Sequence, residues 1–484
     1  MKIILINPPV CNDIGHKLAD TPPLGLLYLA SFLEKNGYRE VKVVDADVAL
    51  MSWPALRDFL IKEKPEIVGL SGASLVLPAL IKTAQLAKEA LPGVITIAGG
   101  FGPTKEPEKV LRDSSGSIDF IVRGEGEVTL LEMVKQIESR EKRYNQIKGL
   151  AYLDQNNLVI TESREAVRDL DSLPWPAYHL LEQKFSDYGG MHARYKEMGR
   201  PNAVMIAARG CPHRCTFCSL GSRLYRQRNP RDVVDEMESY VKKFQAKSIQ
   251  LYDDEFVGLS PKQNEWINQI CDEIIRRDLD KKLSFLVQGR CSQFVDLKTL
   301  QKMRQANFRW IWWGVESGSQ KVLDLIKKDL KIENVIRDFS LAKQAGIKSL
   351  MFIMVGFPGE TPADIKMTAA LVKKIKPDDI AIHIVTPYPG SEMRKYLEEN
   401  NLLETTDYYK FNTRRDVIHH TQEMTAEEIK KYFHLLVFRF SNGHWYFIKF
   451  FFKSLTTIDG WKKLFKRIKM AFSYFSSWFK INVN

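Results

Sequence analysis

Three of the six cysteines in this 484-residue chain lie within eight positions, in the stretch RGCPHRCTFC (209–218). They are Cys211, Cys215 and Cys218, spaced C-x3-C-x2-C, and the neighbouring Gly and Pro allow one loop to turn the thiolates inward. Cysteine thiolates hold Fe–S clusters, and a four-iron cluster normally takes four of them. Three would leave one iron open, which is how a metal site admits a substrate. Zinc is the competing interpretation, but only His213, inside the loop, is near enough to be a fourth ligand.

The composition is that of an ordinary globular protein, with 44% hydrophobic and 27% charged residues. The sequence has no run of about 18 uncharged apolar residues, so no transmembrane helix is expected. The N-terminus is expected to be a first strand and not a signal peptide. Clustered cysteines do not suggest a disulfide framework, so a reducing cytoplasm is expected. The net charge is +12, and residues 429–484 hold eleven Lys/Arg against the single acid Asp459.

Short apolar runs alternate with helical patterns over residues 1–140. Because these runs do not alternate with polar residues, they predict strands that are covered on both faces. The arrangement indicates a doubly wound parallel sheet of the Rossmann or flavodoxin type, whose ligands bind beyond the carboxyl ends of the strands. The predicted strands are 2–7, 41–45, 66–71, 94–98 and 118–122.

Residues 141–199 are expected to form a linker with a β-hairpin. Two apolar runs flank the DQNN stretch 154–157, which is a hairpin signal. The prolines on either side of Trp175 then disfavour helix and predict an extended connector.

The pattern of strand and helix repeats six times over residues 200–395. Alternation at this length predicts a partial (β/α)6 barrel of the TIM type, with its chemistry at the carboxyl ends of the strands. Those ends carry Gly, Pro or charged residues in each case. They are the cysteine loop, DDE (253–255), QGR (288–290), GVESG (314–318), VGFPGE (355–360) and TPYPG (386–390).

The cysteine loop and the strand ends that follow it resemble those of the radical S-adenosylmethionine (SAM) enzymes, in order and spacing. The small residues at strand ends of the first domain resemble the cobalamin-binding domain that precedes the barrel in one branch of that family. The resemblance, which covers about residues 1–395, implies a [4Fe-4S] cluster, SAM and cobalamin as cofactors. The D-x-H-x-x-G loop of many B12 proteins is absent and His16 has the wrong spacing, so cobalamin is expected to bind without a protein histidine.

By the same resemblance, Cys211, Cys215 and Cys218 would be the cluster ligands. The acids 253–255 would hold the SAM amino group, Glu316 the ribose, Arg290 or Ser317 the carboxylate, and Val355-Gly356 would flank the adenine. The implied SAM-binding residues are Phe217, Asp253, Asp254, Glu255, Arg290, Glu316, Ser317, Val355 and Gly356. The implied cobalamin-binding residues are Asn7, Pro9, Ser71, Gly72, Ser74, Gly99, Gly100, Gly124 and Glu125.

Residues 396–484 are expected to form a helical tail. Seventeen of the forty-eight residues from 432 to 479 are aromatic. On a helix from 461, one face would carry Trp461, Leu464, Phe465, Ile468, Phe472, Phe475 and Phe479, with the lysines away from it. Such a helix suits the surface of an anionic membrane, and the alternative is a helical cap over the barrel. A peripheral location on the inner membrane face is therefore expected. A nucleic-acid partner is not expected.

Taken with the resemblance, these features predict a cobalamin-dependent radical SAM C-methyltransferase that acts on a hydrophobic substrate, a lipid or a polycyclic molecule. Cleavage of SAM by the reduced cluster would yield a 5′-deoxyadenosyl radical, and a flavodoxin or ferredoxin would supply electrons. The alternative in the same family is an oxidative cyclase, as in the anaerobic magnesium-protoporphyrin pathway, without methyl transfer. A cobalamin or redox sensor without enzymatic activity is the third hypothesis.

Overall fold

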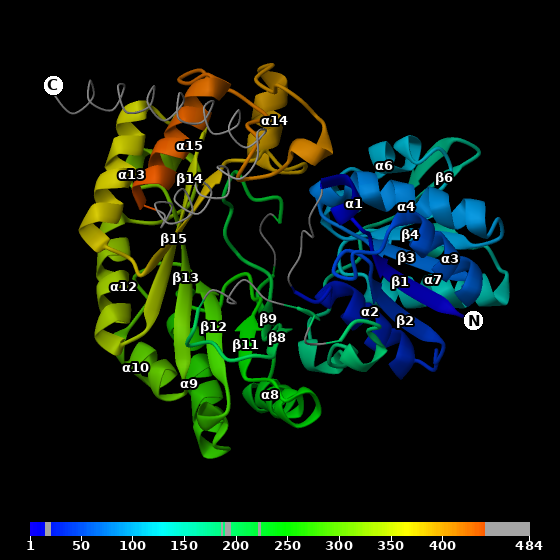
Figure 1. Cartoon of the computed structure of the whole chain (residues 1–484), viewed down its shortest axis with the longest axis horizontal. Helices are drawn as coiled ribbons and strands as arrows, with labels where there is room; N and C mark the ends of the chain where they lie inside the picture. Colours follow the sequence, from blue (N-terminus) through cyan, green and yellow to red (C-terminus); the bar gives the residue numbers. More distant parts are fainter. Residues whose placement is uncertain (15–20, 185–186, 189–194, 221–223, 441–484) are drawn as a thin grey trace, which may run out of the picture.

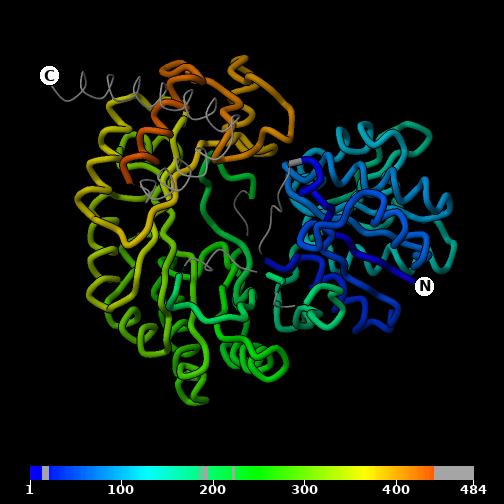
Figure 2. The backbone as a smooth tube through the Cα atoms, viewed as in Figure 1, coloured from blue at the N-terminus to red at the C-terminus, as the bar shows by residue number. Residues whose placement is uncertain are grey.

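The computed structural model describes residues 1–14, 21–184, 187–188, 195–220 and 224–440. In these ranges the chain builds two large sheets, each covered by helices, that stand side by side (Figure 1). The smooth trace in Figure 2 shows that the first domain, in blue and cyan, holds the N-terminus on its outer side, away from the second domain. The α/β fold class predicted from the sequence is confirmed.

The first sheet has seven strands in the order β2-β1-β3-β4-β5-β6-β7. The first five are parallel, and the switch in strand order between β1 and β3 makes this part a doubly wound sheet. The hairpin β6–β7 adds antiparallel to β5, so it is part of this sheet. The strands are β1 (Ile3–Asn7), β2 (Val41–Asp45), β3 (Ile67–Ser71), β4 (Ile95–Gly99), β5 (Phe120–Val122), β6 (Leu150–Asp154) and β7 (Asn157–Ile160).

Both faces of this sheet are buried, as the unbroken apolar runs predict. On β1, Ile3 and Leu5 pack into one core with α2 and α7, whereas Ile4 and Ile6 pack into a second core with α3 and α4. The helices are α1 (Cys11–Ile14), α2 (Leu24–Lys35), α3 (Trp53–Glu63), α4 (Leu77–Ala90), α5 (Phe101–Lys105), α6 (Pro107–Asp113) and α7 (Glu127–Ser139), with a short 3-10 turn, η1 (Ser74–Val76).

The second sheet has six parallel strands in the order β15-β14-β13-β12-β11-β8. Its two outer strands, β15 and β8, do not pair with each other, so the sheet is an open, partial barrel. The strands are β8 (Asn202–Met205), β11 (Ser248–Leu251), β12 (Ser284–Gly289), β13 (Phe308–Glu316), β14 (Lys348–Val355) and β15 (Asp379–Ile384).

The helices of the second domain begin where the sequence provides side-chain caps. Ser260, Asp296 and Thr361 each accept a backbone N–H of the first turn, and Thr361 forms a full capping box with Asp364. The helices are α8 (Pro230–Phe244), α9 (Pro261–Arg276), α10 (Leu297–Gln305), α11 (Gln320–Leu325), α12 (Ile332–Ala345), α13 (Pro362–Ile375), α14 (Glu392–Glu399) and α15 (Ala426–Phe440).

The amino-terminal mouth of the barrel is closed by the segment that enters it. The ring of Tyr195 stacks on that of Trp310 with 4.0 Å between centroids, and its hydroxyl donates to Asp379 Oδ2 at 2.8 Å. Met198 packs in the same small cluster with the inward-facing side chains of the sheet. Among the described residues, these contacts cover the amino ends of the barrel strands.

The carboxyl edge of the first sheet contacts the second domain through the short 3-10 turn η8 (Tyr408–Lys410). The Tyr408 hydroxyl donates to Glu106 Oε2 at 2.5 Å, and the Tyr409 hydroxyl donates to Asp13 Oδ2 at 2.6 Å. Figure 1 shows α1, which follows β1, on the side of the first domain that faces the barrel. The carboxyl edges of both sheets thus lie at one boundary.

Helix α15 starts with a capping box, since Thr425 Oγ1 accepts the N–H of Glu428 and Glu428 Oε2 accepts that of Thr425. Its apolar face, with Ile429, Phe433 and Leu436, is buried against the barrel. Within the described ranges no helix has the length and apolar character needed to span a bilayer. The predicted basic and aromatic helix from 461 onward lies outside the described residues.

Candidate active site

The cysteine loop connects two short paired strands at the start of the barrel. Strand β9 (Ala208–Arg209) pairs antiparallel with β10 (Arg226–Gln227), which closes the loop at its foot. Gly210 has φ of +91°, and a methyl group there would lie 2.2 Å from the carbonyl oxygen of Leu224. Only glycine fits this turn. The loop is also tied to the barrel, because Thr216 N–H donates to the Ile326 carbonyl at 3.0 Å.

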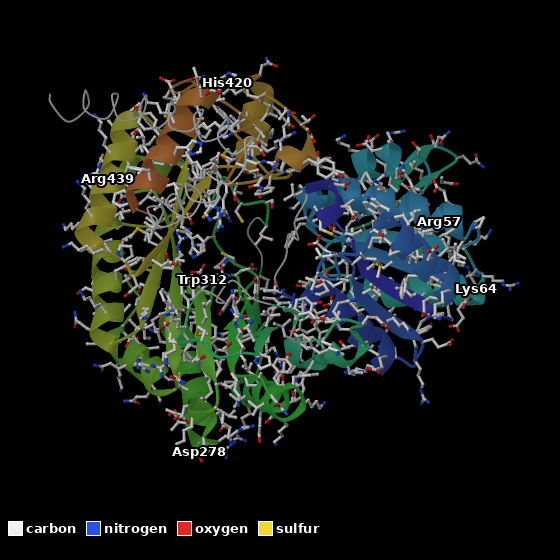
Figure 3. The ribbon with its side chains drawn as sticks, viewed as in Figure 1. Arg57, Lys64, Asp278, Trp312, His420 and Arg439 are labelled. Carbon is white, nitrogen blue, oxygen red and sulfur yellow. The ribbon has the colours of Figure 1, made fainter. Side chains whose placement is uncertain are left out.

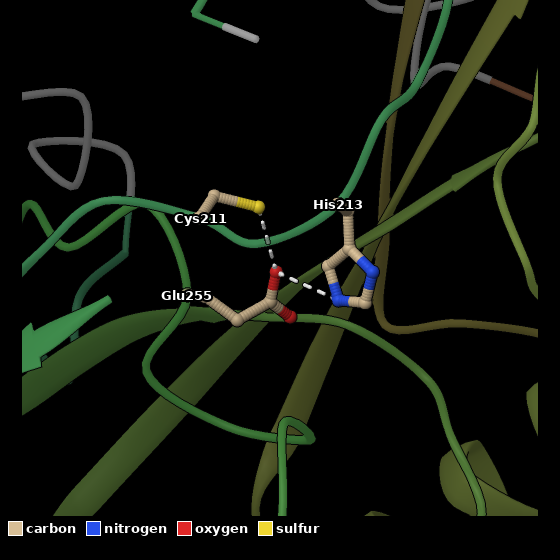
Figure 4. Close-up of side chains that lie close together, drawn as sticks. All are labelled: Cys211, His213 and Glu255. Atoms are coloured by element: carbon tan, nitrogen blue, oxygen red, sulfur yellow. Dashed lines mark hydrogen bonds and ion pairs between the residues drawn. The ribbon is translucent and has the colours of Figure 1, made fainter. Parts of the chain in front are cut away.

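Cys211, Cys215 and Cys218 are all partly exposed on this loop, and the six cysteines form no disulfide within the described ranges. Figure 4 shows Cys211 and His213 on either side of Glu255. The thiol of Cys211 donates to Glu255 Oε2 at 3.6 Å, and His213 Nε2 lies 3.9 Å from the same oxygen. Burial and the carboxylate of Glu255 raise the pKa of Cys211 to about 12, whereas burial lowers the pKa of His213 to about 4.

The ligand atoms of Cys211, His213 and Glu255 lie within 4.8 Å of one another, which is the spacing of ligands that share one ion. If the loop held zinc in place of a cluster, these three residues would be its ligands. Thiolates that hold a four-iron cluster bind different irons and so lie farther apart than ligands of a single ion. Both occupants would use Cys211, but only the cluster would also require Cys215 and Cys218.

A cavity of about 390 Å³ opens beside the cysteine loop at the carboxyl ends of the barrel strands. One half of its wall is charged, with Asp254, Glu255, Arg290, Glu316 and Lys328. Arg290 is buried, its Nη1 lies 3.9 Å from Cys215 Sγ, and its Nη2 has no partner in the part of the chain that the structure describes. Glu255 Oε1 is likewise buried without a partner, and burial raises the pKa of Glu255 to about 7. Unpaired buried charge of both signs is unfavourable unless a ligand satisfies it.

Glu316 and Lys328 form a buried ion pair in this wall, with 2.9 Å between Glu316 Oε1 and Lys328 Nζ. Burial alone would lower the pKa of Lys328, but Glu316 and the thiolate of Cys215 outweigh it, so the pKa is raised. Glu316 ends β13 at an irregularity in the pairing with β14 and has φ of +70°. A positive φ is unfavourable for a residue with a side chain and is often found at functional sites.

The other half of the cavity wall is aromatic or apolar. It is formed by inward-facing side chains of β13, β14 and β15, which are Trp312, Phe352, Met354 and His383. Thr413 closes this side and its hydroxyl lies 2.9 Å from His383 Nδ1. Trp312 lies midway along the second sheet, with Asp278 beyond the amino ends of its strands (Figure 3).

Five of the residues implied for SAM binding line this cavity, and four do not. Asp253 is buried and accepts the N–H of Ala207 at 2.7 Å. Ser317 is buried against Thr368, with 3.3 Å between the hydroxyl oxygens, and Val355 lies in the barrel core. The lining residues are Phe217, Asp254, Glu255, Arg290 and Glu316, and the fourth residue outside the lining is Gly356, whose N–H donates to Glu360 Oε2.

Sequence reasoning did not single out Lys328, Trp312, Phe352, His383 or Thr413. Lys328 and Thr413 come from connections after β13 and β15, where no strand pattern marks them. The strand residues had a signal that could have been used: on a barrel strand every second side chain points inward. Applied to β13, this alternation places Trp312 on the same face as Gly314 and Glu316.

The residues implied for cobalamin binding gather at the carboxyl edge of the first sheet, where Asn7, Ser71 and Gly99 end β1, β3 and β4. Gly100 has φ of +85°, and a methyl group there would lie 2.8 Å from both the Gly72 carbonyl oxygen and Ser71 Oγ. Such packing requires glycine at this position and brings the backbone of the two strand ends close together. Pro9, Gly72 and Ser74 lie in the connections that follow β1 and β3, and Gly124 and Glu125 lie in the connection that follows β5.

Two members of this group make contacts that hold the protein itself together. Asn7 donates to Asp45 Oδ1 at 2.8 Å. Glu125 pairs with Arg226 at 2.5 Å and lies 3.8 Å from Arg209, so it links the first domain to both strands at the foot of the cysteine loop. Among the described residues, no histidine lies in the connections after β1, β3, β4 or β5, and His16 is outside the described residues.

The chemistry of these residues fits the implied cofactors. Three sulfur ligands on one loop suit a cluster with an open iron. The unpaired Glu255 Oε1 and Arg290 Nη2 match the ammonium and carboxylate groups that the amino-acid part of SAM carries. The glycine-lined edge of the first sheet suits the close approach of a large, planar ligand such as cobalamin.

Comparison with known proteins agrees with this assignment. Residues 14–134 match the B12 binding domain family, and residues 205–372 match the Radical SAM superfamily. The chain is 30% identical to an uncharacterized methyltransferase of Pyrococcus horikoshii, over 89% of this chain and 90% of that one. It is 31% identical to the anaerobic magnesium-protoporphyrin IX monomethyl ester cyclase of Rubrivivax gelatinosus, over 85% and 72%.

Among solved structures, the cobalamin-dependent SAM radical enzyme OxsB, with aqua-cobalamin and SAM bound, superposes with a TM-score of 0.71 at 19% identity. The superposition covers 98% of this chain and 72% of OxsB, and it shows a shared fold. The two family matches and the two relatives of 30% and 31% identity extend over most of the chain. The protein therefore belongs to the family of cobalamin-binding radical SAM enzymes, which use a [4Fe-4S] cluster, SAM and cobalamin.

Proposed function

We propose that this radical SAM enzyme is a cobalamin-dependent C-methyltransferase that methylates an unactivated carbon of a hydrophobic substrate. The observation that carries the proposal is the division of one cavity into a charged half beside the cysteine loop and an aromatic half on β13, β14 and β15. An enzyme of this kind needs both: polar ligands for SAM and an apolar place for the carbon to be changed.

The protein's own residues then have distinct roles. Cys211, Cys215 and Cys218 would hold the cluster, and Arg290 and Glu255 would orient the amino-acid part of SAM through opposite charges. When bound, the cluster with SAM supplies hydrogen abstraction, and cobalamin supplies a methyl group. Trp312 and Phe352 would exclude water from the carbon that reacts.

The stoichiometry of such a reaction is fixed. One SAM accepts the substrate hydrogen and leaves as 5′-deoxyadenosine and methionine. A second SAM gives up its methyl group and leaves as S-adenosylhomocysteine, while a C–H bond is replaced by a C–CH3 bond. Two electrons are required, and we infer that a flavodoxin- or ferredoxin-type donor supplies them.

A product count tests the proposal. The full chain is purified without oxygen, reconstituted with iron, sulfide and cobalamin, and supplied with SAM, a strong reductant and a cell-lipid extract. 5′-Deoxyadenosine and S-adenosylhomocysteine that both depend on cobalamin, with a methylated product, are the expected result. The Cys215→Ala variant, prepared in parallel, controls for contaminating enzymes.

The second candidate is an oxidative cyclase, and it is supported by the relative from Rubrivivax gelatinosus. This reaction consumes no second SAM. Deoxyadenosine without cobalamin-dependent S-adenosylhomocysteine would favour the cyclase over the methyltransferase. If neither product forms on an intact cluster, the sensor hypothesis would replace both.

We further infer that the enzyme works in the cytoplasm, with a peripheral contact to the inner membrane face through its basic, aromatic C-terminal residues. The support is the composition of that segment. Because α15 is packed on the barrel, the test is deletion of 441–484, which leaves this helix intact. Loss of pelleting with anionic liposomes is expected, with the cluster retained. Unchanged pelleting would contradict the contact.

A further inference from the structure

Two buried nitrogen atoms in the aromatic half of the cavity have no hydrogen-bond partner among the described residues. They are Trp312 Nε1 and His383 Nε2. Both residues line the cavity, Trp312 from β13 and His383 from β15. Buried polar atoms in folded proteins nearly always have partners, so an unpaired pair in one wall of one cavity points to a ligand.

The indole groups of β13 provide an internal comparison. Trp310 Nε1 donates to Glu197 Oε1 at 2.9 Å, and Trp313 Nε1 donates to Ser349 Oγ at 3.1 Å. Trp312 lies between them on the same strand and is only 3% exposed, yet its buried N–H donates to no acceptor within the described ranges. An indole nitrogen can only donate. The missing partner of Trp312 is therefore an acceptor.

His383 presents a neutral ring to the cavity. Its Nδ1 lies 2.9 Å from Thr413 Oγ1, which fixes the orientation of the ring and leaves Nε2 for a ligand. Burial, with the charge of Arg414, lowers the pKa of His383 to about 4, so the ring is uncharged near neutral pH. A neutral imidazole nitrogen pairs with a hydroxyl or carbonyl group and offers no ion pair to a carboxylate.

The surface between these two nitrogens is apolar. The ring of Phe352 lies 5.9 Å from that of Trp312 and 5.8 Å from that of His383, measured between centroids, and Met354 adjoins it on the same strand. The charged side chains of the lining belong to the opposite half, beside the cysteine loop. A ligand seated over Phe352 would meet an aromatic floor with one polar atom toward each end.

We propose that Trp312 and His383 are specificity-determining residues that select an uncharged, ring-containing substrate bearing a hydroxyl or carbonyl oxygen. The inference rests on the proposed function, because it assigns the aromatic half of the cavity to the substrate and the charged half to SAM. A hydrocarbon without oxygen would leave both nitrogens unpaired. A carboxylate would lose its hydration, and neither Trp312 nor the neutral ring of His383 carries a positive charge to pair with it.

Binding of probe molecules tests this without turnover. The probes are phenanthrene and its hydroxy and carboxy derivatives, and affinity is measured by equilibrium dialysis on the reconstituted, SAM-loaded full chain. The hydroxy derivative is expected to bind about tenfold more tightly than phenanthrene, since one buried hydrogen bond contributes about 1.4 kcal/mol. The carboxy derivative is expected to bind more weakly than both.

Two shape-preserving variants locate the effect. Trp312→Phe and His383→Phe should each reduce the preference for the hydroxy derivative to about threefold or less, and the double variant should abolish it. Trp310→Phe, on the same strand but at the closed end, and the exposed His420→Phe serve as matched controls and should keep it.

Equal binding of phenanthrene and its hydroxy derivative would overturn the proposal, as would a preference that survives the double variant. Tighter binding of the carboxy derivative would overturn the claim that the substrate is uncharged. Because dialysis needs no reaction, a failure here is separate from a failure of methyl transfer, which the count of S-adenosylhomocysteine reports.

Discussion

The carboxyl edges of the two sheets lie at one boundary of the molecule, but different kinds of chemical group form them. The edge of the first sheet is made of backbone and small residues, and a methyl group added at Gly72 or Gly100 would lie 2.8 Å from neighbouring atoms. The edge of the second sheet is made of long side chains, with Arg290, Glu316 and Lys328 pointing into a cavity.

This difference between the two edges matches the difference between the ligands that they would bind. Cobalamin is a large, rigid ligand that carries its own chemistry, so the protein needs a flat surface that lets it approach. SAM is small and charged, so its position depends on groups of opposite charge at fixed points. Substitutions should therefore act by charge at the second edge and by volume at the first.

The largest effect is expected at the cysteine loop. Cys215→Ala removes one of three cluster ligands and should abolish both iron binding and SAM cleavage. The measurement is iron and sulfide content with the visible absorbance of the reconstituted protein. Cys271→Ala, at a buried cysteine of α9, is the control that should keep its iron. Full iron content in Cys215→Ala would contradict the cluster assignment.

The next effect concerns charge at the second edge. Lys328→Met leaves the buried carboxylate of Glu316 without its partner, and we expect SAM to bind at least tenfold more weakly. Lys327→Met is a matched control, because this neighbouring lysine pairs with Glu392 at the exposed surface and should matter little. The dissociation constant is measured by equilibrium dialysis with labelled SAM. Equal constants for both variants would show that the buried pair does not act on SAM.

A smaller effect is expected from volume at the first edge. Gly100→Ala adds a methyl group where two oxygens already lie within 2.8 Å and should weaken cobalamin binding about tenfold. Gly116→Ala has a similar positive φ, +83°, but no atom within 4 Å of the new methyl group. It therefore controls for backbone strain alone. If both variants bind cobalamin equally well, the close packing at Gly100 is not part of the site.

The smallest effect is expected in the pH dependence of stability, through Glu360 at the carboxyl edge of the second sheet. Burial raises the pKa of Glu360 to about 8, although the N–H groups of Gly356 and Phe357 lower it. A carboxyl group whose folded pKa is raised stabilises the fold at low pH, and that contribution is lost as pH rises through the folded value. The melting temperature of the cofactor-free protein should therefore fall between about pH 5 and pH 8.

Glu360→Gln keeps an acceptor for the Gly356 N–H but does not ionise, so its melting temperature should fall less over that range. Glu399→Gln, an exposed change on α14, should leave the dependence as it is in the wild type. A parallel decline in all three proteins would show that Glu360 is not the group responsible.

Most of the fold could be predicted from the sequence, because apolar runs without alternation specify buried parallel strands. Ile3 to Ile6 illustrate this, since successive residues face two different cores. The pairing of β6–β7 with β5 was not predicted. The turn at Gln155 and Asn156, both with positive φ, specifies a hairpin but not the strand beside which it lies.

The site could be predicted where chemistry lies close in sequence, as in the cysteine loop, and at strand ends such as Arg290 and Glu316. It could not be predicted where tertiary packing brings in remote segments. Thr413 reaches the cavity because the Ile384 N–H donates to its carbonyl at 2.6 Å, a contact across about thirty positions of the chain. Lys328 belongs to the site because it is buried in an ion pair with Glu316, and no local sequence pattern predicts that pair.

The central claim is that three cysteines hold a four-iron cluster whose open iron faces SAM in the charged half of the cavity. Mössbauer spectroscopy of the iron-reconstituted protein, with and without SAM, tests it most directly. The account predicts that one iron of the four changes its spectrum when SAM is added. A spectrum that SAM leaves unchanged would contradict it, as would a protein that binds zinc through Cys211, His213 and Glu255 in place of iron.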